Sequence, residues 1–244
     1  MKYLLTVAYN GKNYCGYQKQ KNGISIQEKL TDAAVSLFGE GVSITGCSRT
    51  DSGVHAKGFK ATLECRQTSI TLDKIPTALN SVLPEDISIL DAETVSDSFH
   101  PRYDVKSKEY RYVIHNGKIR DPFFAGRAYH YPKPLDHNIM DEAAKCFVGE
   151  HDFASFMASG SKIVDTVRTV YSCNVSREGD IITVSIVGNG FLYNMVRIIV
   201  GTLISVSDGK IMPTDIISII NARDRSRAGS TAPAHGLYLY DVKY

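Results

Sequence analysis

The sequence has no long hydrophobic run, and none of its apolar stretches approaches the roughly 20 residues that a membrane-spanning helix needs. Its N-terminus also differs from a signal peptide, because Met1-Lys2 leads directly into a strand-like pattern. We therefore expect no association with a membrane and no export. A cytoplasmic setting is expected instead.

Cysteine is scarce and scattered. The five cysteines are an odd number and never form a C-x-x-C pair, and the seven histidines never fall at metal-ligand spacing. We therefore expect neither a disulfide framework nor a metal site. The sequence also lacks a Gly-rich phosphate loop and a G-x-S-x-G nucleophile motif.

The sequence has almost no excess of one sign of charge. Its net charge is only +2, so composition alone does not indicate a nucleic-acid partner. The basic residues are nevertheless grouped: Lys12, Lys19 and Lys21; Arg102, Lys106, Lys108 and Arg111, followed by Lys118 and Arg120; and Arg223, Arg225 and Arg227. Such groups form a positive groove if the fold brings them together. Separate solvated faces are the alternative.

Hydrophobic periodicity divides the chain into two halves, 1–105 and 106–244, with similar element orders. The first half reads as β-α-β-β-α-β, the ferredoxin-like arrangement. Its helices begin at the capping box Ser25 to Glu28 and near 73, and its strands are expected at 2–9, 42–47, 58–65 and 87–91. Pro76 is tolerable because it lies in the first turn of the second helix.

The second half is expected to repeat this order. Strands are predicted at 110–115 and 127–131, a helix at 136–147, a hairpin at 167–176 and 181–187, helices at 194–206 and 213–222, and a final strand at 237–242. The expected fold class is therefore α+β: two ferredoxin-like halves with mostly antiparallel sheets that meet around a central catalytic cleft.

A carboxylate follows the apolar run 42–47 in the stretch Arg49-Thr50-Asp51-Ser52-Gly53. Charged residues at the exit of a strand are often used to build a site. The alternative is that Asp51 only begins a turn and pairs locally with Arg49.

The predicted helix 194–206 contains a single charged residue, Arg197. A helix that is apolar on every face is normally buried, so an unpaired guanidinium there would cost several kcal/mol. A carboxylate from elsewhere should meet Arg197, and Asp51 is a candidate because its loop is otherwise poor in carboxylates. In the alternative, Arg197 extends past its neighbours to solvent.

Tyrosines lie beside basic residues in two segments. Tyr110 and Tyr112 share one face of a strand and Arg111 points to the other, which suits stacking on an unpaired base. Tyr14 and Tyr17 in the basic loop invite the same interpretation. Strand tyrosines are, however, commonly core residues, and His100 is either a base or a structural residue.

Several motifs in the same order resemble the tRNA pseudouridine synthase A family over nearly the whole chain. They are Tyr9-Asn10-Gly11, Gly16-Tyr17-Gln18-Lys19-Gln20, Arg49-Thr50-Asp51-Ser52-Gly53-Val54-His55-Ala56, Phe99-His100-Pro101-Arg102, Tyr110-Arg111-Tyr112, Gly190-Phe191-Leu192-Tyr193-Asn194-Met195-Val196-Arg197 with Gly201, and Gly236-Leu237-Tyr238-Leu239. Three residues depart from the usual pattern: Ser48 replaces Gly, Asn10 replaces Asp and Pro101 replaces Ala.

The resemblance implies an isomerase that converts uridine to pseudouridine at positions 38, 39 and 40 of the tRNA anticodon stem-loop, without a cofactor or metal. It implies that Asp51 is the catalytic aspartate, Arg49 a substrate-contacting neighbour, Tyr110 the tyrosine that packs on the target base, and Arg197 the partner of the carboxylate. Asp51 acts either as a nucleophile on C1′ or as a base.

The resemblance further implies a homodimer that binds both the anticodon stem-loop and the body of tRNA. Contacts to tRNA are expected from Lys19, Arg102 and Arg111. Three other readings stay open: a nucleoside hydrolase, a non-catalytic RNA-binding protein, and a purely structural ferredoxin-like pair.

Overall fold

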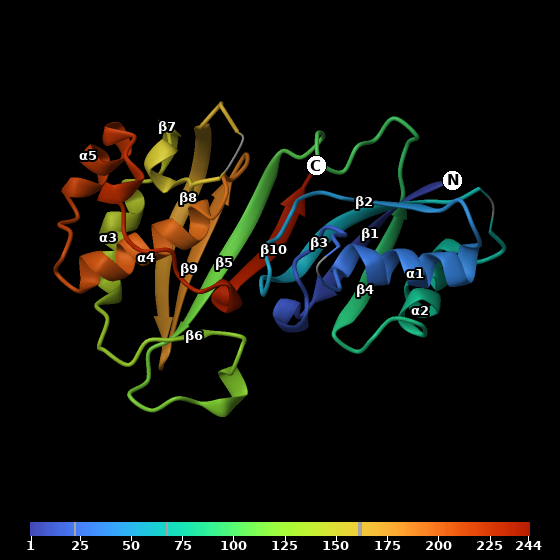
Figure 1. The fold of residues 1–244 in the computed structure, drawn as a ribbon, viewed down its shortest axis with the longest axis horizontal. Coiled ribbons are helices and arrows are strands. Elements are labelled where there is room, and N and C mark those ends of the chain that lie inside the picture. Colours follow the sequence, from blue (N-terminus) through green and yellow to red (C-terminus); the bar gives the residue numbers. More distant parts are fainter. Residues whose placement is uncertain (22, 67, 161–162) are drawn as a thin grey trace. The chain divides into compact units, whose positions relative to one another are not determined.

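The computed structural model describes residues 1–21, 23–66, 68–160 and 163–244 (Figure 1). The chain forms two compact units: Met1–Lys106 together with Tyr238–Tyr244, and Ser107–Leu237. Most strand pairs within them are antiparallel, and helices are interspersed with strands along the chain. The expected α+β class is confirmed.

The first unit has the predicted β-α-β-β-α-β order. Its elements are β1 (Lys2–Tyr9), α1 (Ile26–Phe38), β2 (Ser43–Gly46), β3 (His55–Glu64), α2 (Ile75–Asn80) and β4 (Ile87–Thr94). β1 lies between β4 and β3 and pairs antiparallel with both, whereas β2 pairs with the end of β3. The Ser25 side chain caps α1 by accepting a hydrogen bond from the Glu28 N–H, which confirms that half of the capping box.

Two elements of the first unit differ from expectation. The helix predicted at 73–82 is a 3-10 turn, Leu72–Lys74, followed by the shorter α2 with Pro76 in its first turn. β3 begins at His55 rather than at residue 58, because β10 (Leu237–Lys243) pairs parallel with its start, Tyr238 opposite His55. That pairing joins segments that are distant in sequence, so local periodicity could not show it.

The second unit contains β5 (Ser107–His115), β6 (Tyr129–His130), α3 (His137–Lys145), β7 (Gly149–Asp152), β8 (Val167–Glu178), β9 (Ile181–Gly188), α4 (Met195–Ser207) and α5 (Asp215–Ala222). Its strand order is β5-β9-β8-β7, with β6 paired to β5. The predicted hairpin 167–187 is confirmed as β8 and β9.

The second half departs from a plain repeat in three ways. The strand expected at 127–131 shortens to the two residues of β6, and β7 was not expected because its sequence, Gly-Glu-His-Asp, has no hydrophobic alternation. The final strand, β10, was assigned to 106–244, but all of it except Leu237 belongs to the first unit.

α4 is buried on nearly every face, as its composition predicts. Its backbone also contacts the segment 229–232 closely, because a Cβ on Gly201 would lie 1.7 Å from the Ser230 carbonyl oxygen. Gly201 is therefore required for this approach. None of the helices in the described ranges is both long and apolar enough to cross a membrane.

Candidate active site

Asp51 lies in the loop between β2 and β3 of the first unit and is half-buried. The Val54 N–H donates to the Asp51 carbonyl at 3.1 Å, which closes a turn. Gly53 has a φ of +78°, a conformation that favours glycine. Asp51 therefore begins a turn, as the simpler reading of the sequence supposed.

A second loop of the first unit supports this turn. The Tyr17 N–H donates to the Thr50 carbonyl at 3.1 Å, and the Ser52 hydroxyl donates to the Tyr14 carbonyl at 3.2 Å. A Cβ on Gly16 would lie 2.6 Å from the Thr50 oxygen, and one on Gly11 would lie 1.9 Å from the Val54 oxygen. Both glycines therefore allow the backbones of the two loops to touch.

The residues on either side of Asp51 are fixed as well. Thr50 is buried, and its hydroxyl lies 2.8 Å from that of Tyr9 at the end of β1. His55 is buried at the start of β3, where its Nδ1 accepts the Gly11 N–H at 3.0 Å. The carboxylate is thus carried on a backbone held from both ends, whereas the neighbouring Arg49 is exposed.

Tyr110 lies on β5 in the second unit and is buried to 7% exposure. Its ring meets Phe191 edge to face, with ring centroids 5.1 Å apart. Tyr112, on the same face, is a core residue whose hydroxyl donates to the Pro233 carbonyl at 2.7 Å. Burial raises the pKa of Tyr112 well above its usual value of 10.0, so this hydroxyl stays protonated.

Arg197 is half-buried on α4. Its Nε donates to the Ala232 carbonyl at 2.7 Å, and an Nη donates to the Asn194 side-chain oxygen at 2.7 Å. The Ala232 N–H in turn donates to the Arg197 carbonyl at 3.1 Å. The guanidinium therefore has a defined orientation within the second unit. The predicted pairing with Asp51 would join the two units, and it stays a prediction.

Two of the other basic candidates have an acidic side chain nearby. The Lys19 ammonium is exposed and lies 3.9 Å from a Glu28 carboxylate oxygen. The Arg111 Nε lies 2.6 Å from a Glu109 carboxylate oxygen. Arg102 is half-buried and donates its backbone N–H to His100 at 3.2 Å. Their contacts to tRNA stay predictions.

Three further candidates are structural. Tyr17 is buried and stacks on Phe59, with ring centroids 4.2 Å apart. Tyr14 is also buried, and its hydroxyl donates to Asp86 at 2.5 Å. Neither tyrosine is therefore placed to stack on a base. His100 accepts backbone N–H groups and stacks on a neighbouring tyrosine ring, as a structural residue does.

One residue near Arg197 was not singled out from the sequence. His235 is half-buried, and its ring meets Tyr129 with centroids 6.4 Å apart. Burial, and then the charge of Arg197, lower the pKa of His235 below its usual 6.5. In the sequence, His235 directly precedes the Gly236-Leu237 motif, and this position could have identified it as a candidate. Within the described residues no group of three His, Cys, Asp or Glu side chains could hold a metal ion.

Comparison with known proteins finds related sequences. A family model described as tRNA pseudouridine synthase matches residues 5–104 and 143–244, which include Asp51 and Arg197 but not Tyr110. The tRNA pseudouridine synthase A of Caldicellulosiruptor saccharolyticus is 47% identical over 241 residues, which are 99% of this chain and 98% of that protein. The Bacillus licheniformis protein of the same name is 46% identical over 246 residues, 100% of this chain and 99% of that protein.

Among solved structures, a chain of a Cbf5-Nop10-Gar1 complex matches with a TM-score of 0.37 and 12% identity, covering 83% of this chain and 44% of that one. That likeness is too distant to add to the fold described above. The family match and the two relatives each extend over most of the sequence. This chain therefore belongs to the tRNA pseudouridine synthase family.

Proposed function

We propose that this protein isomerises uridine to pseudouridine at positions 38, 39 and 40 of the tRNA anticodon stem-loop, with Asp51 as the catalytic carboxylate. The observation that carries the proposal is the support of the Asp51 turn. Gly11 and Gly16 bring a second loop against its backbone, and Thr50 anchors it to Tyr9. A carboxylate on a fixed backbone suits a reaction that depends on its position to within about an ångström.

The reaction breaks the C1′–N1 bond of uridine, rotates the uracil and forms a C1′–C5 bond. The proton on C5 is lost and N1 gains one, so the change is an isomerisation that balances without a cofactor, a metal or an external energy source. Asp51 begins it either as a nucleophile on C1′ or as a base. In both routes the carboxylate must be ionised when the reaction starts.

Arg197 and Tyr110 are proposed to act with Asp51. A cation near a carboxylate favours the ionised form, and the Arg197 guanidinium is oriented by the Ala232 and Asn194 oxygens. Tyr110, with Phe191 against its ring, would pack on the detached uracil and assist proton transfer at C5. Arg49, which is exposed beside Asp51, would contact the substrate.

The target uridine must leave its helical stack, which costs a few kcal/mol. Contacts between basic side chains and the tRNA backbone offset that cost, and we assign them to Lys19, Arg102 and Arg111. We further propose that the protein works in the cytoplasm as a homodimer, one protomer holding the tRNA body while the other supplies the active site. A monomeric mass by light scattering at working concentration would contradict the dimer.

Nucleoside analysis of an unmodified tRNA transcript tests the reaction. The wild-type protein should produce pseudouridine, whereas free uracil would indicate a hydrolase, and neither product would indicate a binding protein. Asp51→Ala should abolish pseudouridine while leaving folding and tRNA affinity largely intact. Asp51→Glu should also fail, because one methylene moves the carboxylate by about an ångström.

The matched control is Asp32→Ala, which removes an exposed carboxylate from α1 in the same unit. This variant should retain wild-type turnover. Substantial turnover by Asp51→Ala would refute the assignment of the catalytic residue, whatever the similarity to the family.

A further inference from the structure

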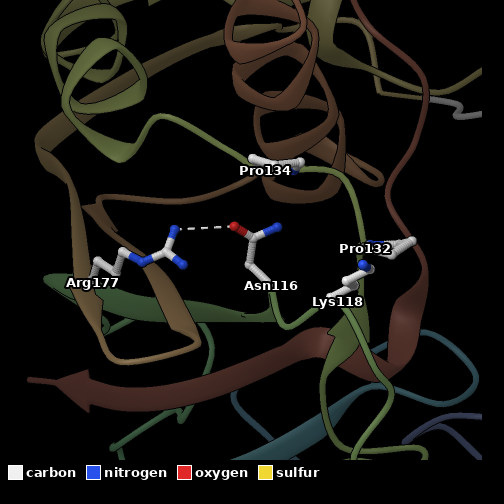
Figure 2. A pocket seen from close by; sticks show the side chains of 5 residues that line it. All are labelled: Asn116, Lys118, Pro132, Pro134 and Arg177. Carbon is white, nitrogen blue, oxygen red and sulfur yellow. Dashed lines mark hydrogen bonds between the residues drawn. The ribbon is translucent and has the colours of Figure 1, made fainter.

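The second unit contains an open pocket of about 440 Å³ that plays no part in the proposed chemistry. Its lining consists of two cations, one amide and two prolines: Lys118, Arg177, Asn116, Pro132 and Pro134. Figure 2 shows the Arg177 guanidinium reaching toward Asn116, with Lys118 and Pro132 on the other side. None of the five lining residues is acidic, so the pocket suits an anion.

The frame of this pocket is rigid because Asn116 is buried and fully hydrogen-bonded. Its amide nitrogen donates to the Tyr131 and Lys133 carbonyls at 2.7 Å each. Its oxygen accepts from the Leu135 N–H at 3.1 Å and from Arg177 Nη1 at 3.0 Å. Asn116 therefore builds the pocket and has no capacity left for a ligand.

The two cations retain capacity for a ligand. The Arg177 Nε donates to the Gly179 carbonyl, and its Nη1 donates to the Asn116 side-chain oxygen and the Leu135 carbonyl. Its Nη2 makes no hydrogen bond to any described residue. Lys118 is exposed and forms no ion pair with any described residue. Asp180 lies close to Gly117 but is not part of the pocket lining.

Lys118 also lies near the start of a loop, residues 117–127, that leads from β5 toward β6. In Figure 1 this loop, drawn in yellow-green, extends away from the strands of its unit. Two large apolar side chains on it face solvent: Ile119 is 81% exposed and Phe123 is 77% exposed. Arg120 is exposed between them.

The loop is ordered by its own contacts. The Asp121 carboxylate accepts the Phe123 N–H at 2.8 Å and begins a 3-10 turn. The Arg127 guanidinium donates to the Phe123 carbonyl. The next aromatic, Phe124, turns inward and stacks on buried His115, with ring centroids 5.4 Å apart. Phe123 is therefore presented to solvent on a fixed turn.

We propose that the pocket and the loop 117–127 form an additional RNA-binding site, which rests on the proposed function in tRNA. A backbone phosphate occupies the pocket between Lys118 and Arg177, and Phe123 stacks on an unpaired base. Basic side chains next to an exposed aromatic ring are the combination that single-stranded RNA requires. A protein partner is disfavoured because Lys118 and Arg120 would have to be desolvated beside the apolar side chains.

Filter-binding measurements of tRNA affinity between 50 and 200 mM KCl test this site. Lys118→Gln combined with Arg120→Gln should lower the slope of log Kd against log salt by about 1, the value for one lost phosphate contact. Phe123→Ala should raise Kd about tenfold with little change in slope, the usual size of one lost stacking contact. Arg177→Lys keeps a cation in the pocket while losing the paired geometry, so it should have a smaller effect on the slope.

Two exposed residues of the same unit provide controls. Lys145→Gln removes a cation from α3, and Met212→Ala removes an apolar side chain that is 61% exposed. Both should bind tRNA as the wild-type protein does. Inorganic phosphate, compared with chloride at equal ionic strength, should compete with tRNA only weakly, since the site requires a base as well.

The outcomes separate this site from the proposed function. If the wild-type protein makes pseudouridine but the Lys118, Arg120 and Phe123 variants bind tRNA as the controls do, the additional site is overturned. If these variants change the mass measured by light scattering and leave tRNA affinity intact, the surface is a protein interface and the inference fails. If the wild-type protein makes no pseudouridine, the proposed function fails, whatever the affinities are.

Discussion

The Arg197 guanidinium is oriented by two neutral oxygens, one from Ala232 and one from Asn194. Neither acceptor cancels its charge. Both oxygens belong to the second unit, whereas the effect we assign to the charge, an ionised Asp51, concerns catalysis. These two contributions of Arg197 can be separated by mutation.

We predict that Arg197→Met impairs catalysis more than stability. Methionine fills a similar volume and removes a partly buried charge, so the loss in the free energy of unfolding should be limited to a few hydrogen bonds, about 1–3 kcal/mol. Turnover should fall about a hundredfold or more, the usual effect of losing an electrostatic contact at a reacting centre. Urea denaturation and pseudouridine formation measure the two effects.

Arg197→Lys is the companion variant. It keeps the cation but cannot make both hydrogen bonds, so it should retain more activity than the methionine variant. Outright unfolding of Arg197→Met would mean that Arg197 serves mainly the core. Normal turnover would mean that it does not act on Asp51.

His235 allows a prediction of pH dependence. Burial and Arg197 lower its pKa in the folded protein, so below about pH 6.5 the unfolded chain binds a proton that the folded protein resists. Stability should therefore decrease as the pH falls through 6.5, by at most about 1.4 kcal/mol per pH unit for one proton. In His235→Gln the free energy of unfolding should fall less over this range. Urea denaturation at pH 7.5, 6.5 and 5.5 measures it. An equal decrease in the variant would show that His235 is not responsible.

At the scale of elements, the site in the first unit depends on the contact between two loops. Gly16 has a φ of +113°, and a Cβ there would lie 2.6 Å from the Thr50 carbonyl oxygen. Gly39, which ends α1, also has a positive φ, +77°, but a Cβ there would meet nothing within 4 Å. Both glycines thus have a positive φ, but only Gly16 lies in close contact with another segment.

We predict that Gly16→Ala lowers turnover more than Gly39→Ala does. Both variants should lose stability, about 1–2 kcal/mol for an alanine at positive φ. Only Gly16→Ala should also displace Thr50 and with it Asp51, which reduces the rate of the folded enzyme. Melting temperatures, together with single-turnover rates measured well below them, distinguish the effects. Equal rates for the two variants would mean that the loop contact does not position Asp51.

At the scale of the whole molecule, the basic residues assigned to tRNA are spread over both units. Lys19 and Arg102 belong to the first unit, and Arg111 and Lys118 to the second. No single element collects them, and none resembles a helix that reads base edges. Binding should therefore depend on the folded shape of tRNA rather than on a short sequence.

We predict that whole tRNA is modified more efficiently than an isolated anticodon stem-loop, by about tenfold or more in kcat/KM at low salt. The difference should narrow as salt rises, because backbone contacts release counterions. Steady-state rates for both substrates at 50 and 200 mM KCl measure it. Equal efficiency at low salt would contradict a contribution from basic residues remote from the active site.

Local patterns in the sequence determined most of the elements. The capping serine and apolar spacing predicted α1, the two strand patterns at 167–176 and 181–187 predicted the β8–β9 hairpin, and uniform apolarity predicted the buried α4. These features depend on neighbours within a few residues, so a single sequence reveals them. The order of motifs likewise indicated the family.

Only the tertiary structure decided which distant segments meet. β10 returns to β3, Thr50 meets Gly16, and Ala232 accepts from Arg197. In each case the contact involves backbone groups, which are the same in every residue, so side-chain patterns do not identify the partner. The role of Tyr17 depends on a distant segment as well. Its ring is buried because Phe59 of β3 stacks on it, and the sequence of its own loop does not show this. The sequence thus indicated which residues are candidates for the chemistry, and long-range backbone contacts determined how they are held.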